Sequence, residues 1–197
     1  MSDAETTRES EPGTAGDGGD DESGSERRRT VNGDDDDLRA LRTVADYQFG
    51  RGAGGALFPS GATFELRTSA SGRPRQVYHG GERLVSYGTD GLVTLGVAGG
   101  RRLVADDDAS APRVVVGAES DPYVREGCNA FAKFVREVAD GVRPGAEAVV
   151  VADDAVVGVG RAMLRPAAMR AFETGVAVGV RHGAGDAEAE AEAETEA

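Results

Sequence analysis

The apolar residues of this chain are confined to a central region that lies between two polar ends. Residues 1–37 consist mainly of Gly, Ser, Thr, Asp and Glu, and residues 185–197 alternate Ala and Glu. Segments of such composition cannot bury enough apolar surface to offset the entropy lost on ordering. We therefore expect residues 1–37 and 185–197 to form disordered acidic tails on either side of a folded body.

The body opens with a helical pattern and continues with β-type alternation. In LRALRTVADYQF the apolar residues recur at three- and four-residue spacing, which predicts a helix over about 38–48. From residue 62 the pattern alternates, and the turn sequences GG and TDG separate β-type runs, which predicts a meander of about four strands. Because residues 98–112 should run from a strand end into a linker, we expect a small α+β domain over residues 38–110.

Short strands joined by glycine or aspartate turns dominate the rest of the body. RVVVG at 113–117 predicts a buried strand, and Asp121 as N-cap with Pro122 at the first helical position predicts a short helix that ends near Gly127. AFAKFVREVAD continues as a strand, ADD joins two further strands, RPAAMRAFETG forms a turn or short helix, and VAVGVRH is the last strand. This succession predicts a compact β-barrel-like domain over residues 111–184.

The charge of the chain is unevenly distributed. The formal net charge is −13, yet residues 39–183 carry a net charge of +2, and the two ends supply all the acidity. Lys133 is the single lysine among 22 basic residues. Acid excess with almost no lysine suits a cytoplasm rich in salt, so we expect a halophilic source. A body that stays slightly basic favours an anionic partner, with nucleic acid as the first candidate.

Few residues carry the chemistry of a catalytic or metal site. Cys128 is the single cysteine, and the chain has two histidines, so we expect no zinc site and no cofactor. GRGAGG at 50–55 matches a dinucleotide-binding pattern, but it follows a helix rather than a strand, so we interpret it as a loop. A lone cysteine cannot form an internal disulfide, which favours a cytoplasmic location, and no apolar run approaches the ~20 residues of a membrane span.

Four segments of the C-terminal domain form the pattern of a known family. They are VVVGAESDPYVREGCNAFAKFV, VRPGAEAVVVADD, VVGVGRAML and GVAVGVRHG, and together they resemble the PUA domain, a small RNA-binding pseudo-barrel. Upstream, VADYQFGRGAGGALF and SGRPRQVYHGGERLVSYGTDGLVTLGVAGGRRL resemble the region that precedes the PUA domain in archaeal tRNA-guanine transglycosylases and the related archaeosine synthase. Nothing in the chain resembles the large (β/α)₈ catalytic domain of those enzymes. The resemblance therefore implies an RNA-binding α+β chain that is not itself an enzyme.

The resemblance also implies where RNA is bound, namely in a groove between the short first helix of the PUA-type domain and its last strands. There guanidinium, ammonium and backbone N–H groups hold phosphates, and glycines allow the RNA backbone to approach closely. The residues predicted on this basis are Arg125, Gly127, Lys133, Arg136, Gly160, Arg161, Arg181 and His182. Purely structural roles stay open for some of these residues. Arg161 could cap the edge of a sheet, His182 could be a structural histidine, and the two glycines, Gly127 and Gly160, could be turn or bulge residues that need no ligand.

These observations predict a protein that binds structured RNA, with transfer RNA as the first candidate partner. One predicted role is that of the RNA-docking subunit of a separately encoded transglycosylase-like enzyme. Two alternatives stay open, namely a free-standing protein that binds ribosomal or another RNA, and an adaptor that binds a partner protein. An enzyme with its activity in the first domain finds no support in the arrangement of residues.

Overall fold

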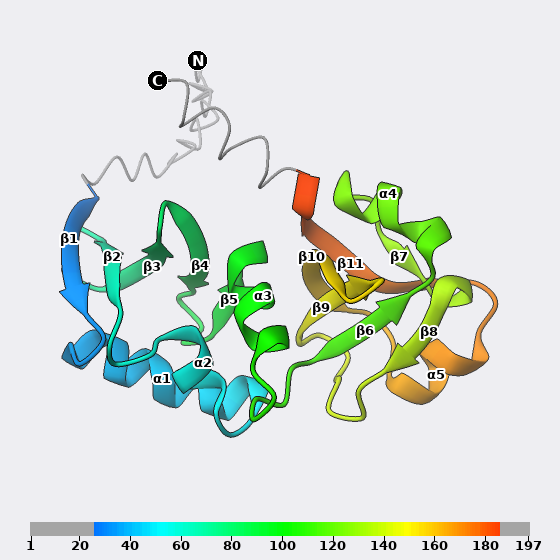
Figure 1. Ribbon diagram of the computed structural model, residues 1–197, viewed down its shortest axis with the longest axis horizontal. Helices are drawn as coiled ribbons and strands as arrows, with labels where there is room; N and C mark the ends of the chain where they lie inside the picture. Colours follow the sequence, from blue (N-terminus) through cyan, green and yellow to red (C-terminus); the bar gives the residue numbers. More distant parts are fainter. Residues whose placement is uncertain (1–25, 186–197) are drawn as a thin grey trace, which may run out of the picture.

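The computed structural model describes residues 26–185, which form two units joined by a short linker. Each unit is built on its own sheet, and the helix α3 lies between the two sheets (Figure 1). The elements of the first unit are β1 (Arg27–Asn32), α1 (Asp36–Phe49), α2 (Ala53–Leu57), β2 (Thr63–Thr68), β3 (Pro74–His79), β4 (Glu82–Tyr87), β5 (Val93–Leu95) and α3 (Val97–Ala105). Those of the second unit are β6 (Arg113–Val116), α4 (Asp121–Arg125), β7 (Ala130–Phe131), β8 (Val135–Val138), β9 (Glu147–Ala152), β10 (Ala155–Ala162), α5 (Pro166–Ala171) and β11 (Val176–Gly183), with 3₁₀ turns at Ala118–Ser120 and Ala132–Phe134.

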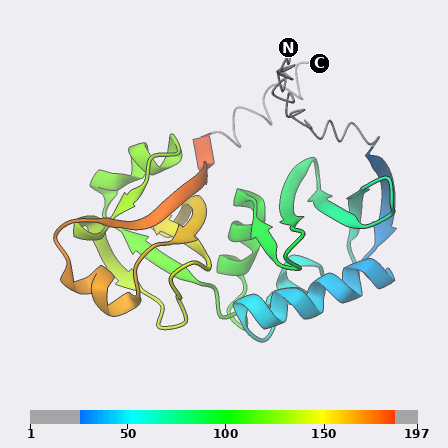
Figure 2. The same ribbon diagram turned by 180° about the vertical axis from the view of Figure 1, so that it is seen from behind.

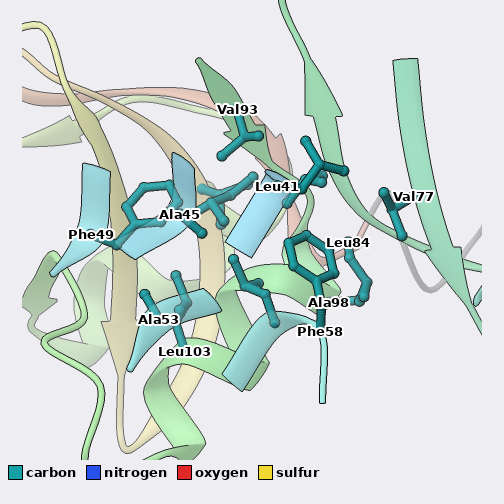
Figure 3. Close-up of a cluster of buried hydrophobic side chains, with 14 of the residues drawn as sticks. Leu41, Ala45, Phe49, Ala53, Phe58, Val77, Leu84, Val93, Ala98 and Leu103 are labelled. Atoms are coloured by element: carbon teal, nitrogen blue, oxygen red, sulfur yellow. The ribbon is translucent and has the colours of Figure 1, made fainter. Parts of the chain in front are cut away.

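The sheet of the first unit is an antiparallel meander in the order β1-β2-β3-β4-β5. Leu66, Val77, Val85 and Leu95 face one another across four neighbouring strands, and all four are buried. This apolar row packs with buried residues of α1, α2 and α3, such as Leu41 and Leu103, in one core (Figure 3). Alternate residues of the strands and every third or fourth residue of the helices are thus apolar and pack against one another in this core.

The sheet of the second unit curls into a half-barrel in the order β7-β11-β10-β9-β6-β8. Its pairs are antiparallel except for β6 and β9, which run parallel. All six residues of β9 are buried, because one face of the strand lines the core of the second unit and the other faces the first unit. A strand that is buried on both sides reads as a continuous apolar run, as AVVVA does here.

The mixed α+β class predicted from the sequence is confirmed, together with most of the elements. The helix over about 38–48, the meander, the buried strand at Arg113–Val116 and the last strand are all present. The turn of the sequence ADD uses Asp153 and Asp154, both with positive φ, between β9 and β10. Aspartate is one of the few non-glycine residues that tolerate this conformation.

The predicted disorder of residues 1–37 is wrong for residues 27–37. Residues 27–32 form β1, which pairs antiparallel with β2 along its whole length and buries Val31. Arg29, which lies within the expected tail, donates hydrogen bonds to Asp35 at 2.8 Å and to Asp37. The opposite charges therefore connect β1 to the first turn of α1. The tails 1–25 and 186–197 lie outside the described residues.

The linker predicted over residues 98–112 is wrong in its first half, because Val97–Ala105 is the helix α3. Two adjacent glycines make this helix possible. A Cβ on Gly99 would lie 2.1 Å from the carbonyl oxygen of Leu84, and one on Gly100 would lie 2.8 Å from Cγ1 of Val159. The glycines let α3 approach the sheets of both units, although glycine ordinarily disfavours a helix.

Three local predictions also need correction. The loop expected at 50–55 contains the start of α2, and the strand expected from residue 130 onwards is interrupted by a 3₁₀ turn between β7 and β8. Asp121 is the first residue of α4 rather than its cap, and its carboxylate pairs with Arg125. Each of these segments is shorter than about six residues, where local patterns discriminate poorly between helix and strand.

Elements of both units lie along the same side of the molecule. In both views α1 and α5 lie along one side of the molecule, whereas the β3–β4 turn, α4 and the end of β11 lie along the opposite side (Figures 1 and 2). A ligand that runs along this second side meets elements of both units.

Candidate functional site

The end of α4 lies directly against the end of β11. A Cβ on Gly183 would lie 2.0 Å from the carbonyl oxygen of Arg125 and 2.7 Å from the backbone nitrogen of Gly127. Gly127 has φ +83°, which reverses the chain after the helix at no steric cost. This close approach of backbones brings two of the predicted residues, Arg125 and Gly127, to the junction between the helix and the last strand.

The segment after α4 then runs alongside β11. Asn129 accepts a hydrogen bond from the backbone N–H of Val180 at 3.1 Å, and Ala130 and Phe131 of β7 pair with the first half of β11. The next residues lead to Lys133, whose ammonium group lies 4.6 Å from the ring centroid of Phe134 and is exposed. The residues from Arg125 to Lys133 thus form one track beside β11, which we call the β11 track.

Two exposed aromatic side chains accompany the β11 track and are absent from the predicted set. Tyr123 on α4 is 61% exposed, and Phe131 on β7 is 42% exposed. Phe131 and Lys133 are exposed on either side of the buried Ala132, so the alternating pattern AFAK signals both, although a 3₁₀ turn rather than a strand follows Phe131. An aromatic ring beside a cation offers a stacking surface for a base together with a partner for a phosphate.

Strand β10 holds Gly160 and Arg161, which differ completely in exposure. Gly160 is buried, and a Cβ there would lie 2.1 Å from the carbonyl oxygen of Gly179 on β11, so this glycine allows the two strands to approach. Arg161 is exposed opposite Gly179 and Glu147, and its guanidinium makes no ion pair within residues 26–185. Only Arg161 of the two presents a group that a ligand can contact.

Arg181 and His182 face the first unit rather than the β11 track. Arg181 pairs with Glu147 and donates a hydrogen bond to the carbonyl oxygen of Leu95 at 3.3 Å. The Nε2 atom of His182 lies 2.7 Å from Nη2 of Arg83. The structural role that we left open for His182 is therefore visible in these contacts, and Arg181 has a similar role.

Arg136 lies on β8 and forms an ion pair with Glu119, which precedes α4. Both side chains are about half exposed, so the pair contributes little to stability. The structure thus groups Arg125, Gly127 and Lys133 in the β11 track and places Arg136, Arg161 and the residues at the end of β11 outside it.

Within the described range 26–185, no three His, Cys, Asp or Glu side chains are close enough to hold a metal ion. In the same part of the chain no helix is both long and apolar enough to cross a membrane.

Comparison with known proteins identifies both units. Residues 39–109 match the family model of the patch-forming domain C2 of tRNA-guanine transglycosylase, and residues 112–184 match the PUA domain. The tRNA-guanine(15) transglycosylase of Methanothermobacter thermautotrophicus is 40% identical over 150 residues, which are 75% of this chain and 23% of that protein. The enzyme of Pyrococcus abyssi is 39% identical over 148 residues, which are 74% of this chain and 25% of that protein. The chain therefore spans about a quarter of the length of these curated relatives.

Solved structures agree with the architecture. A PUA domain from Aeropyrum pernix K1 superposes with a TM-score of 0.62 at 19% identity, over 84% of this chain and 91% of that one. A conserved PUA domain protein from Thermoplasma acidophilum gives a TM-score of 0.59 at 20% identity, over 83% of this chain and 99% of that one. At these identities the likeness establishes the fold alone. The prediction of an α+β unit followed by a PUA-type pseudo-barrel is confirmed.

Proposed function

We propose that this chain, which belongs through its two domains to the patch-forming C2 and PUA families, binds structured RNA, with transfer RNA as the first candidate. The observation that carries the proposal is the β11 track. It combines a close backbone approach at Gly127, an exposed ammonium group at Lys133 and an exposed ring at Phe131. Phosphate, ribose and unstacked bases are recognised by groups of these kinds.

The distribution of charge supports the same proposal. Residues 26–185 carry no net charge and residues 39–183 carry +2, in a chain whose overall charge is −13. Lys133 and Arg161 make no ion pair in the described range and are exposed, so both can meet phosphates. Because each phosphate contact releases counterions, binding of this kind weakens as salt rises.

We further propose that the RNA binding serves a tRNA modification system. The curated relatives carry the name tRNA-guanine(15) transglycosylase, and this chain matches only the C-terminal region of those enzymes. The chemical step would then belong to a separate transglycosylase-like protein, and this chain would dock the RNA for it. A cytoplasmic location in a halophilic archaeon is consistent with the acidic composition.

The test measures the affinity of the full chain for a transfer RNA transcript and for a single-stranded RNA of equal length over a series of salt concentrations. We expect tighter binding of the transfer RNA, and a linear fall of log affinity with log salt. Absence of RNA binding at every salt concentration that keeps the protein folded would refute the proposal.

A pull-down from native extract at high salt then decides the role, because recovery of a transglycosylase-like protein supports the docking subunit. Recovery of ribosomal RNA, or of an unrelated protein without RNA, would favour the alternatives.

A further inference from the structure

An ion pair with a buried carboxylate and a partly exposed guanidinium lies at the boundary between the two units. Nη1 of Arg181 donates a hydrogen bond to Oε1 of Glu147 at 3.0 Å, and Nη2 donates one to Oε2 at 2.5 Å. Glu147 is only 6% exposed. The same carboxylate accepts a hydrogen bond from the backbone N–H of Leu95 at 2.8 Å, and the guanidinium donates to the carbonyl oxygen of Leu95 at 3.3 Å. The pair therefore binds both polar groups of one residue of the first unit.

A bulge in β11 directs two consecutive side chains toward the first unit. His182 pairs with Val159 and Val180 pairs with Gly160, so Arg181 is an extra residue without a partner on β10. In a regular strand neighbouring side chains point to opposite faces, whereas a bulge can aim both to one side. Here Arg181 reaches Leu95 of β5, and His182 reaches Arg83 of β4.

The apolar packing across the boundary is continuous. Val149 and Val159 of the second sheet belong to the same buried cluster as the core of the first unit, and both approach Gly100 of α3. An ion pair whose carboxylate is buried in such packing fixes orientation, because rotation of one unit would leave the buried Glu147 carboxylate without its hydrogen-bond donors. The two units are held as one body rather than as two domains on a flexible linker.

Exposed cations without ion pairs occur on both units. Within residues 26–185 these include Arg28 on β1 and Arg75 on β3 in the first unit, and Lys133 and Arg161 in the second. The β3–β4 turn, α4 and the end of β11 also share one side of the molecule (Figures 1 and 2). Both units therefore carry groups that can contact phosphates, and the contacts at the boundary fix the distance and orientation between these groups.

We propose that Arg181 is a positioning residue, which with Glu147 locks the two units in one orientation so that a single folded RNA is bound across both of them. The proposal rests on the RNA binding proposed above and specifies its ligand as an RNA longer than one stem. The affinity for such an RNA combines contacts to both units. Once one unit has bound the RNA, the rigid linkage holds the other unit close to it, so the second set of contacts forms at a high effective concentration. A short hairpin, which meets only the β11 track, gains nothing from the linkage.

Glu147→Gln separates this proposal from direct contact between Arg181 and RNA. The variant keeps the shape of the side chain and leaves the guanidinium in place, but it removes the charge that holds it. If Arg181 contacts RNA directly, loss of a nearby carboxylate raises the affinity for a polyanion. If Arg181 is a positioning residue, affinity for a full transfer RNA falls by about tenfold, whereas affinity for a single-stem hairpin is unchanged.

Two further measurements keep the test decisive. Small-angle X-ray scattering of the RNA-free chain should show a broader distance distribution for Glu147→Gln and for the double variant E147Q/R181M than for the parent. Arg39→Ala, which removes an exposed ion pair with Asp36 on α1, is the matched control and should change neither scattering nor affinity. Unchanged scattering together with unchanged or increased affinity for transfer RNA would overturn the proposal. If the parent chain binds no RNA, the proposed function fails, while scattering still reports whether the pair sets the orientation.

Discussion

Gly100 of α3 lies directly over Val159 of β10, since a Cβ built on the glycine would be 2.8 Å from Cγ1 of the valine. The two residues belong to different units, and their contact has no room for even one methyl group. Because valine is held stiffly in a strand, this neighbour cannot move aside cheaply.

Gly100→Ala is therefore expected to destabilise the protein by about 1 kcal/mol, because overpacking outweighs the usual gain in helix propensity. Gly55→Ala is the matched control, since Gly55 is an exposed residue of α2 with no atom within 4 Å of the added Cβ. It should stabilise the chain by about 0.5 kcal/mol. Chemical denaturation of both variants measures these changes, and stabilisation at both positions would show that α3 does not pack as described.

Asp35 caps the first turn of α1 and connects it to β1. Its side chain accepts hydrogen bonds from the backbone N–H of Asp37 at 3.0 Å and from Arg29 at 2.8 Å. Asp35→Ala should cost about 1 kcal/mol of stability, as removal of a helix N-cap does. Asp35→Asn should cost less, because asparagine keeps the cap and loses only the ion pair.

The contribution of this ion pair should depend on pH. The hydrogen bond from Arg29 holds the pKa of Asp35 below its ordinary value. A carboxyl with a lowered pKa in the folded state stabilises the protein above its ordinary pKa, and this stability is lost progressively as pH falls below about 4 towards the lowered pKa. The difference in denaturation midpoint between the parent and Asp35→Asn should therefore be present at neutral pH and shrink in acid. A difference that is constant over this range would contradict the assignment.

Lys133→Ala and Phe131→Ala should each weaken binding of transfer RNA by about 1 kcal/mol or more. Both side chains are exposed, so the melting temperature should change little. The two variants should differ in their salt dependence, because loss of the lysine lowers the slope of log affinity against log salt by about one, and loss of the ring leaves it unchanged. Unaltered affinity in both variants would show that the β11 track is not the RNA surface.

The acidic ends should compete with RNA for the folded body. Residues 1–25 and 186–197 contain eight and six acidic residues, and the described chain begins and ends on the same side as α4 (Figure 1). Removal of both segments should leave the fold intact and leave RNA affinity equal or slightly higher. Removal of residues 1–37 should instead destabilise the protein, because it deletes β1 and the cap of α1. A large loss of affinity on the shorter deletion would place the ends within the binding site.

Local signals in the sequence were sufficient wherever one segment determines its own structure. The spacing of apolar residues in α1, the continuous apolar run of β9 and the aspartate turn before β10 each act over a few residues. The same holds for the glycine that ends α4 and for the exposed lysine three residues after β7 begins. The fold class and part of the candidate site could therefore be predicted.

The sequence by itself determined the helices and strands with strong periodicity, the polar ends and the confinement of the acid excess to those ends. The tertiary structure alone decided that Arg27–Asn32 is a strand, that Val97–Ala105 is a helix, and that Arg181 and His182 connect the units. In each case the stabilising partner is distant in sequence: β2 for the strand, the two sheets for the glycine-rich helix, and Leu95 and Arg83 for the end of β11. Periodicity and composition describe what a segment can bury, but only the folded chain supplies the surface that it is buried against.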